Sequence, residues 1–579
     1  MAWPCLRATC WRRNTPQQNA ADVITLHGPR AVPVLAWMAV ALPWLWPWAP
    51  PPSPSVPGLL VTWCLTALLW GVLFGAGAGA TPRLPSSIVW GLTGLLAWAA
   101  WRMPVLDLAL LGGLAGSVLC VVVASYCVTT ARAPLLPTLC KALVGAAVIS
   151  TLIAGLQYSG LLHQPLPWLS WLHASPNEEA YGQLRQRNQF GSLMSLGLAA
   201  WLYLAQSAVE RRTTRVIAWV ILLVLTLGQV ASTSRTGALT WIGVCLLGAW
   251  WPTRTATRTT SLDARAGAGM ALIGFMVMCW IVPALATSLA TVELPKVSAF
   301  ERLVAQTEGL GLCESRVVLW RHVLELAQQQ PWIGWGWGEL DYAHATRPVE
   351  GVRFCGQLGN AHNLLLQTVV EWGWPLALCG WGALVLWILR SKPWQVRTPS
   401  AMLGWSWLGV ICVHSLLEFP LWYGPFQLVL GLAIGLINAS RSIDNSAKPS
   451  PHQAFTPAST SSAISRGVVS LWLGCTLWAG WDYHRVSQIF QPAAQRSTEC
   501  RIQPQSCLDD VVWFHQGRDF ALLGLNANTM PPQQASALAQ RVAHFAPEPW
   551  VLAWAFPKLA PPSDVPATAT APGSTASPR

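Results

Sequence analysis

The amino-acid sequence predicts an all-α protein that crosses a membrane many times. Of its 579 residues, 53% are hydrophobic and only 10% are charged, whereas a soluble globular protein carries about 25% charged residues. Apolar runs of about 20 residues recur along the chain, which is the length that a helix needs to cross the hydrocarbon core of a bilayer. Many of the 37 tryptophans lie near the ends of these runs, as in aromatic belts.

The apolar runs predict about thirteen transmembrane helices. The basic tail 1–31 precedes the first of them, which we expect to be a retained signal-anchor because the apolar run begins only after several arginines. Transmembrane helices are expected throughout 32–290 and again within 363–484. The thirteen predicted spans fall near residues 32–50, 57–77, 86–101, 105–127, 135–160, 189–208, 216–231, 237–251, 269–290, 363–389, 400–416, 421–438 and 467–484.

The distribution of lysine and arginine predicts the orientation. With the basic tail inside, the cytoplasmic connections hold clusters such as Arg211, Arg212 and Arg215, while the short outward turns hold few basic residues. The net charge of +12 is therefore mostly topological. Because it is scattered over alternate loops and forms no patch, we do not expect nucleic-acid binding.

Several segments outside the spans follow from this topology. Residues 291–362 form a long outward loop, and 485–560 are expected to form a small outward helical region. The linker 440–465 and the tail 561–579 are rich in Ser, Thr and Pro and are expected to be disordered.

Cysteine usage agrees with the predicted orientation. The four cysteines in outward segments make two pairs, Cys313–Cys355 and Cys500–Cys507, which an oxidising compartment would permit. Loop-closure entropy assigns about 4 and 2.5 kcal/mol to the two bonds. Four unpaired thiols are the alternative that the sequence leaves open.

Polar residues gather at the outward ends of the spans. Arg187 lies in "RQRNQFGS", Arg235 in "ASTSRTGAL", His362 at the end of the long loop, and His414 and Glu418 in "VHSLLEFPLWYG". Each has an ordinary explanation: an arginine can anchor a span end, a histidine can bind a carbonyl, and residues at i and i+4 can form a structural pair. Their convergence on one side of the membrane favours a functional site.

The long loop contains two further patterns. The stretch "ESRVVLWRHVLELAQQQP" predicts an amphipathic helix whose apolar stripe is Val317, Trp320, Leu324 and Ala327. Such a helix would lie on the membrane surface or pack on the protein. The following "PWIGWGWGEL" has spaced glycines but no preceding strand, so it favours a turn over a nucleotide-binding loop.

The chemistry of these residues suggests a transferase. The sequence has no HExxH, CxxC or Walker motif, so we expect neither a metal nor ATP, and any activated substrate must come from the membrane. Two outward arginines suit a pyrophosphate, and an imidazole suits removal of a hydroxyl proton. Together they predict glycosyl transfer from a polyprenyl pyrophosphate sugar, in which the arginines stabilise the leaving group.

At residues 180–435 the chain resembles the O-antigen ligase/polymerase superfamily, the Wzy/WaaL/PglL group of inverting GT-C glycosyltransferases. The matching pieces, in order, are "RQRNQFGSLMSL", "ASTSRTGAL", "ESRVVLWRHVLELAQQQPWIGWGWGEL", "GNAHNLLLQTVVEWGWPLAL" and "HSLLEFPLWYGPFQLVLG". The resemblance implies transfer of a preassembled glycan from undecaprenyl pyrophosphate, without metal or cofactor. It places the active site on the periplasmic face of the bacterial inner membrane.

The resemblance also assigns roles to residues. The essential histidine of the group falls on His362, as the base or as the group that positions a substrate, and the pyrophosphate-binding arginines fall on Arg187 and Arg235. Gln189 and Asn363 are supporting candidates. Arg316 precedes the loop helix, where it either shapes the site or serves ordinary loop structure.

Three acceptors compete within the group. The outward C-terminal region and "HSLLEFPLWYGPFQ" look most like the PglL-type protein O-oligosaccharyltransferases, which glycosylate Ser or Thr of pilins and other periplasmic proteins. A ligase would modify the lipid A core, and a polymerase would extend a second lipid-linked glycan. A transporter of lipid-linked sugars is the alternative from another class, although no inverted repeat is visible.

Overall fold

A computed structural model describes the protein at residues 31–75, 86–130, 135–163, 171–175, 179–206, 212–252, 263–289, 313, 315–356, 358–445 and 459–557. All regular structure in these ranges is helical. The helices that coincide with predicted spans are α1 (Ala31–Leu45), α2 (Ser55–Gly75), α3 (Ser86–Arg102), α4 (Leu108–Thr130), α5 (Leu135–Tyr158), α6 (Arg187–Ala205), α7 (Arg212–Ala231), α8 (Arg235–Ala249), α9 (Ala264–Leu289), α14 (Trp374–Ser391), α15 (Pro399–Ser415), α16 (Gly424–Asn445) and α17 (Ser459–Ile489).

The predicted membrane character is confirmed. Six helices, α2, α4, α5, α7, α9 and α14, are long and apolar enough to cross a membrane, and α1 and α8 are shorter apolar helices. Of the six, α9 and α14 are the least buried against the rest of the protein, so their apolar side chains are left to face lipid. The chain is thus a polytopic helical membrane protein, and the count of thirteen spans stays a prediction.

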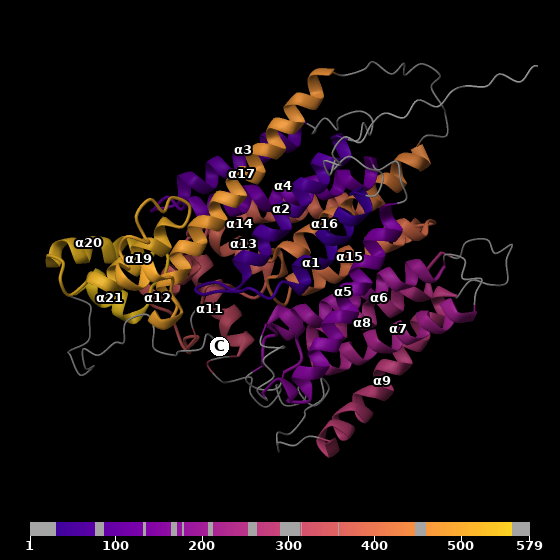
Figure 1. The fold of residues 1–579 in the computed structure, drawn as a ribbon. Helices are drawn as coiled ribbons and strands as arrows, with labels where there is room; N and C mark the ends of the chain where they lie inside the picture. Colours follow the sequence, from indigo (N-terminus) through magenta and orange to yellow (C-terminus); the bar gives the residue numbers. More distant parts are fainter. Residues whose placement is uncertain are drawn as a thin grey trace, which may run out of the picture.

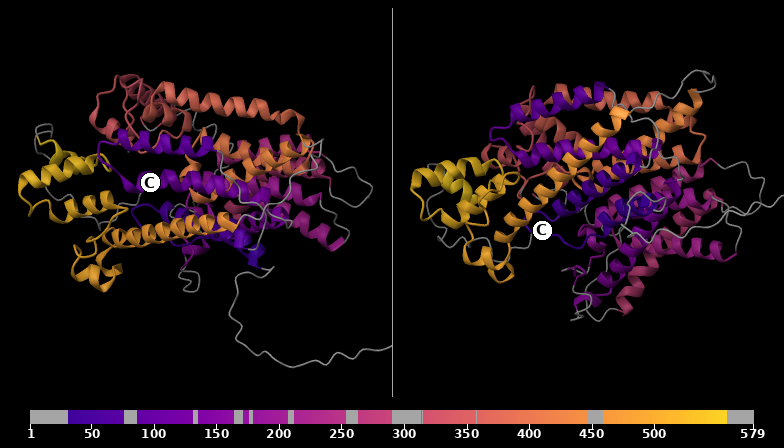
Figure 2. Two further views of the ribbon diagram at one scale, coloured as in Figure 1. Left: turned by 90° about the horizontal axis from the view of Figure 1, so that it is seen from above. Right: turned by 45° about the horizontal axis from the view of Figure 1, so that its top comes forward.

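The helices form a bundle in which α6 lies among α5, α7, α8 and α15 (Figures 1 and 2). Most residues of α6 are buried, because α5, α8 and α15 pack around it. Its sequence carries Ser192 and Ser195 among Leu and Ala, a composition less apolar than that of its neighbours. A helix surrounded by other helices can hold such polar residues, since they bond to neighbouring side chains rather than facing lipid.

The predicted span 363–389 is wrong as a single helix. It divides at Gly373 into α13 (Leu364–Trp372) and α14. Gly373 has a φ of 80°, and a Cβ there would lie 2.5 Å from the Trp332 carbonyl oxygen, so the position requires glycine. The glycine-rich turn "PWIGWGWGEL" packs against the end of α13, where the Trp335 backbone N–H donates to the Val370 carbonyl at 2.9 Å.

The long loop builds a small core of its own. Helices α11 (Arg316–Gln329), α12 (Leu340–Thr346) and α13 share a cluster of buried apolar residues that includes Leu319, Val323 and Val370. The amphipathic prediction for α11 was only partly right. Ala327 of the predicted stripe is buried, whereas Val317 is 55% exposed. The side of α11 that faces the core therefore only partly coincides with the predicted stripe.

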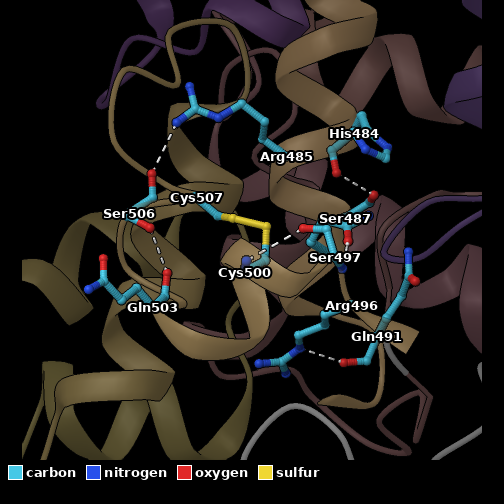
Figure 3. The surroundings of a disulfide bond; sticks show 11 residues. His484, Arg485, Ser487, Gln491, Arg496, Ser497, Cys500, Gln503, Ser506 and Cys507 are labelled. Carbon is cyan, nitrogen blue, oxygen red and sulfur yellow. Dashed lines mark hydrogen bonds between the residues drawn. A yellow bond between two sulfur atoms is a disulfide. The ribbon is translucent and has the colours of Figure 1, made fainter. Parts of the chain in front are cut away.

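The C-terminal region consists of α17 and four short helices, α18 (Thr498–Ile502), α19 (His515–Asn526), α20 (Pro532–Ala543) and α21 (Pro549–Ala555). Figure 1 shows α19, α20 and α21 gathered at one end of the bundle, in yellow. A disulfide joins Cys500 to Cys507, and Arg485 of α17 donates to the Ser506 carbonyl at 3.1 Å (Figure 3). The disulfide ties α18 to the turn that follows it, and the hydrogen bond from Arg485 joins that turn to α17.

The linker 440–465 was expected to be disordered throughout, but both of its ends are helical. Helix α16 continues to Asn445 and α17 begins at Ser459, so the chain is helical on both sides. Residues 446–458 lie outside the described residues, as do most of the basic tail 1–31, the first part of the long loop and the tail 561–579.

Candidate active site

The candidate site lies where the N-termini of α6, α8, α11 and α13 meet. A side-chain oxygen caps each of these helices by accepting a backbone N–H. The accepting residues are Gln186, Ser234, Ser315 and Asn363. The three predicted arginines and His362 stand directly beside the caps: Arg187, Arg235 and Arg316 each follow one, and His362 precedes one. The free N–H groups and the helix dipoles make this convergence favourable for an anion.

Glu418 connects three of these helices. Its Oε2 lies 2.7 Å from Nδ1 of His362, and its Oε1 forms an ion pair with Arg316. The same Oε1 accepts a hydrogen bond from Asn188 Nδ2 at 2.8 Å. The carboxylate is only 6% exposed, so its charge is satisfied by these neighbours rather than by water.

Two opposing effects determine the pKa of Glu418. Burial raises the pKa, but the hydrogen bond from His362 and the charges of His362 and Arg316 outweigh burial, so the pKa lies below the ordinary value. Glu418 is therefore a carboxylate at neutral pH, and a carboxylate only accepts hydrogen bonds. Nδ1 of His362 then carries the proton of this hydrogen bond in either charge state, and in the neutral ring Nε2 is the free nitrogen.

The His362 ring is held in place from several sides. Its backbone has a φ of 49°, a left-handed conformation that is uncommon for residues other than glycine. The backbone N–H of His362 donates to Asn360 Oδ1 at 2.8 Å. Phe419 contacts the imidazole ring edge-to-face, with 5.1 Å between the ring centroids. The side chain remains 37% exposed, so the ring is partly open to a substrate.

The two predicted pyrophosphate ligands have different surroundings. Arg187 forms an ion pair with Glu179 at 2.7 Å. Arg235 lies within electrostatic range of Arg187, Arg316 and Glu418, and within the described ranges it makes no hydrogen bond or ion pair. Arg235 is thus the cation of this group that a ligand can engage without displacing another side chain.

A close helix crossing brings Arg187 and Arg235 together. Where α6 crosses α8, a Cβ on Gly237 would lie 2.8 Å from the Gly191 Cα, so the two backbones touch. Ser234 Oγ also donates to Asn188 Oδ1 at 2.7 Å. The two helices therefore begin side by side, with an arginine at the first position of each.

The remaining predicted residues occupy supporting positions. Asn363 caps α13 and also donates to the Leu416 carbonyl at 3.1 Å. Gln189 is 2% exposed and bonds the hydroxyl of Tyr423. His414 is fully buried, with Nδ1 2.8 Å from Ser192 Oγ, so it packs α15 against α6 and does not face the site.

Sequence reasoning grouped Glu418 with His414 on one helical face, which the structure does not support. Helix α15 ends at Ser415, and Glu418 lies in the following turn, where it contacts His362 and Arg316. Two residues of the cluster were missed. Asn188 lies within the quoted "RQRNQFGS", beside Arg187, whereas nothing in the sequence singles out Glu179.

The Cys313–Cys355 disulfide closes the loop behind this site. The two Cα atoms are 5.4 Å apart, and the bond joins the residue just before α11 to the segment that leads to His362. The disulfide thus links the segment that carries Arg316 to the segment that carries His362.

Fold and site together define a multi-pass helical membrane protein with a cluster of arginines, a histidine and a glutamate at converging helix N-termini. Residues 219–380 match the family described as "O-Antigen ligase". Residues 402–556 match the family described as "Virulence factor membrane-bound polymerase, C-terminal". The first range contains Arg235, Arg316 and His362, and the second contains Glu418.

Two curated proteins of Acinetobacter baylyi are similar to the chain. A "General O-oligosaccharyltransferase" is 24% identical over 60% of this chain and 57% of its own length. A "ComP-specific O-oligosaccharyltransferase" is 24% identical over 53% of this chain and 50% of its own length. The chain therefore spans about half the length of the curated relatives it matches. These matches confirm the resemblance to the O-antigen ligase/polymerase superfamily that was drawn from the motifs.

Proposed function

We propose that the protein transfers a preassembled glycan from undecaprenyl pyrophosphate to Ser or Thr hydroxyls of periplasmic proteins such as type IV pilin. The observation that carries the proposal is the contact of His362 with Glu418 beside Arg187, Arg235 and four helix N-termini. It combines a candidate base with a candidate pyrophosphate site. The names of both relatives support oligosaccharyl transfer as the reaction.

In the proposed reaction, Nε2 of His362 takes the proton of the acceptor hydroxyl. The oxygen then forms a bond to the anomeric carbon, while the bond from that carbon to the pyrophosphate oxygen breaks. The electron pair leaves with the pyrophosphate, and attack from the opposite side inverts the anomeric centre. Glu418 stabilises the imidazolium that forms, because its Oε2 already accepts the hydrogen bond from Nδ1.

The leaving pyrophosphate gains negative charge as the bond breaks. Arg235 and Arg187 meet that charge, together with the N-termini of α6 and α8, and such fixed donors stabilise developing charge without reorganising. The chain's own groups supply the acid–base and electrostatic functions, so the proposed mechanism needs no metal.

The same proposal assigns the site to the periplasmic face of a bacterial inner membrane. Two features support this assignment. The disulfides Cys313–Cys355 and Cys500–Cys507 lie on the side of the long loop and the C-terminal region, and such bonds persist in oxidising compartments. The alternation of predicted spans assigns the connections rich in lysine and arginine to the opposite side, as expected of cytoplasmic loops.

The second candidate is an O-antigen ligase that modifies the lipid A core, or a polymerase that extends another lipid-linked glycan. The descriptions of the two matching families favour these acceptors, whereas both curated relatives are named O-oligosaccharyltransferases, which is the class of the first candidate. The donor site and the reaction would be the same in each case.

The test uses cells that make an undecaprenyl-linked glycan, lack their own ligases and contain a pilin reporter. Both the pilin and the lipid A core are probed for the glycan. We expect glycan on the pilin with the wild-type protein, none with His362→Ala, and wild-type levels with the control His484→Ala on α17. Glycan on the lipid A core alone would make the protein an O-antigen ligase, and glycan on neither would contradict transfer to these acceptors.

A further inference from the structure

Helix α11 has a second surface that the proposed reaction leaves unused. Its inner side is buried in the loop core. Its outer side lines a groove of about 550 Å³, with Val317, Trp320 and Leu324 as an apolar floor. That volume lies within the range of ligand pockets, which are typically about 300–1,000 Å³.

The groove begins at the candidate active site. Arg316, which pairs with Glu418, immediately precedes Val317 in α11. Trp320 Nε1 donates to the Ala361 carbonyl at 3.1 Å, and Ala361 is the neighbour of His362. The floor is therefore continuous with the residues proposed to act on the anomeric carbon, and the indole ring is fixed in position by its hydrogen bond.

The rim of the groove is polar. Arg321 pairs with Glu325 at 3.1 Å, and its guanidinium lies against Gly351, where a Cβ would be 3.3 Å from Arg321 Nη2. Glu350 and Gln328 complete the rim, and both are exposed. Glu325 is the second carboxylate of the rim, and its Oε1 is held by Arg321.

We propose that this groove binds the sugars of the donor glycan beyond the first, an inference that rests on the proposed function. A pyranose ring presents C–H groups on its faces and hydroxyls at its edge, which suits an apolar floor under a rim of carboxylate, guanidinium and amide groups. From Val317 to Gln328 the helix rises about 16 Å, so several linked sugars fit along it.

Charge separates this groove from the pyrophosphate site. Its rim holds one guanidinium and two carboxylates, so it disfavours phosphate. Arg187 and Arg235, which are proposed to bind the pyrophosphate, do not line the groove and lie at the N-termini of α6 and α8. An acceptor peptide is the less suitable occupant. Extended peptides commonly bind by adding to a sheet edge, and the structure contains no strand in the parts that it describes.

The test compares two synthetic polyprenyl pyrophosphate donors, one with a single sugar and one with the full oligosaccharide. The full-length protein is reconstituted in lipid nanodiscs with a pilin acceptor. Trp320→Ala removes the indole ring from the apolar floor. The double variant Glu350→Gln, Gln328→Ala changes only exposed side chains, so its folding is not at risk. Val352→Ser, at an exposed position of the same loop outside the groove, is the control.

For both groove variants we expect KM for the long donor to rise about three- to tenfold, the range of aromatic and polar contacts of this kind. KM for the short donor and for the acceptor should stay at the wild-type value, as should every constant of the control. A raised KM for the acceptor alone would mean that the groove binds the acceptor, and equal changes for both donors or none would also overturn the proposal. Failure of the wild-type protein to use either donor would instead contradict the proposed function.

Discussion

Replacing Glu418 with glutamine tests the proposed proton transfer most directly. The variant keeps the size of the side chain but removes the negative charge that His362 Nδ1 and Arg316 contact. A hydrogen bond to a charged group contributes about 1.5–3 kcal/mol, which corresponds to about a 10- to 150-fold change in rate. We expect kcat to fall by this factor, because the imidazolium that forms during transfer loses its partner. KM for the donor should change little, since Arg187 and Arg235 remain.

The assay measures initial rates of glycan transfer by the purified protein in nanodiscs, with donor and acceptor varied separately. Glu499→Gln, at an exposed position in α18, is the matched control and should behave as the wild-type protein does. The melting temperature of each variant is recorded, so that loss of folding is distinguished from loss of chemistry. A folded Glu418→Gln variant with wild-type kcat would refute a role for this carboxylate in supporting His362.

Three further predictions concern the scaffold. Gly237→Ala should lower both the melting temperature and transfer, because its Cβ would force α6 and α8 apart; Gly243→Ala, which meets open space in the same helix, should change neither. Cys313→Ser removes a bond that closes a 42-residue separation, so stability should fall by about 4 kcal/mol, while substitution of the exposed free Cys379 should not lower the melting temperature. Burial raises the pKa of Glu371 to about 7. Between the ordinary pKa of a glutamate and about 7, the folded protein therefore retains a proton that the unfolded chain has lost. Stability should fall as pH rises through that window, by on the order of 3 kcal/mol. Glu371→Gln should flatten this dependence in melting curves recorded from pH 5 to pH 8.

The apolar runs predicted the helices well, because a helix in a bilayer must satisfy its own backbone and needs a fixed length. The error at 363–389 has a local cause. Residues on both sides of Gly373 are apolar, and hydropathy alone cannot show that the first part packs on α11 while the second part faces outward. The positive φ of Gly373 and the contact with Trp332 depend on a distant turn.

The composition of the candidate site was also largely predictable, but its connections were not. Sequence placed Arg187, Arg235 and His362 on one side of the membrane by the alternation of loops. It could not show that Glu418 contacts a histidine 56 positions away. That contact exists because α15 ends at Ser415 and the chain turns, which removes Glu418 from the helical face that spacing assigned to it.

The charges of the site explain why its geometry suits a departing pyrophosphate better than a bound one. Glu179 pairs with Arg187 and Glu418 pairs with Arg316, so Arg235 is the cation left without a carboxylate among the described residues. The remaining positive potential comes from the helix N-termini, each equivalent to about half an elementary charge. In the proposed reaction, the lipid-linked pyrophosphate gains a further negative charge when its bond to the anomeric carbon breaks. Arg235 and the N–H groups at the helix N-termini are fixed in place before that charge develops. They would therefore stabilise the transition state more than the ground state, which is the condition for catalysis.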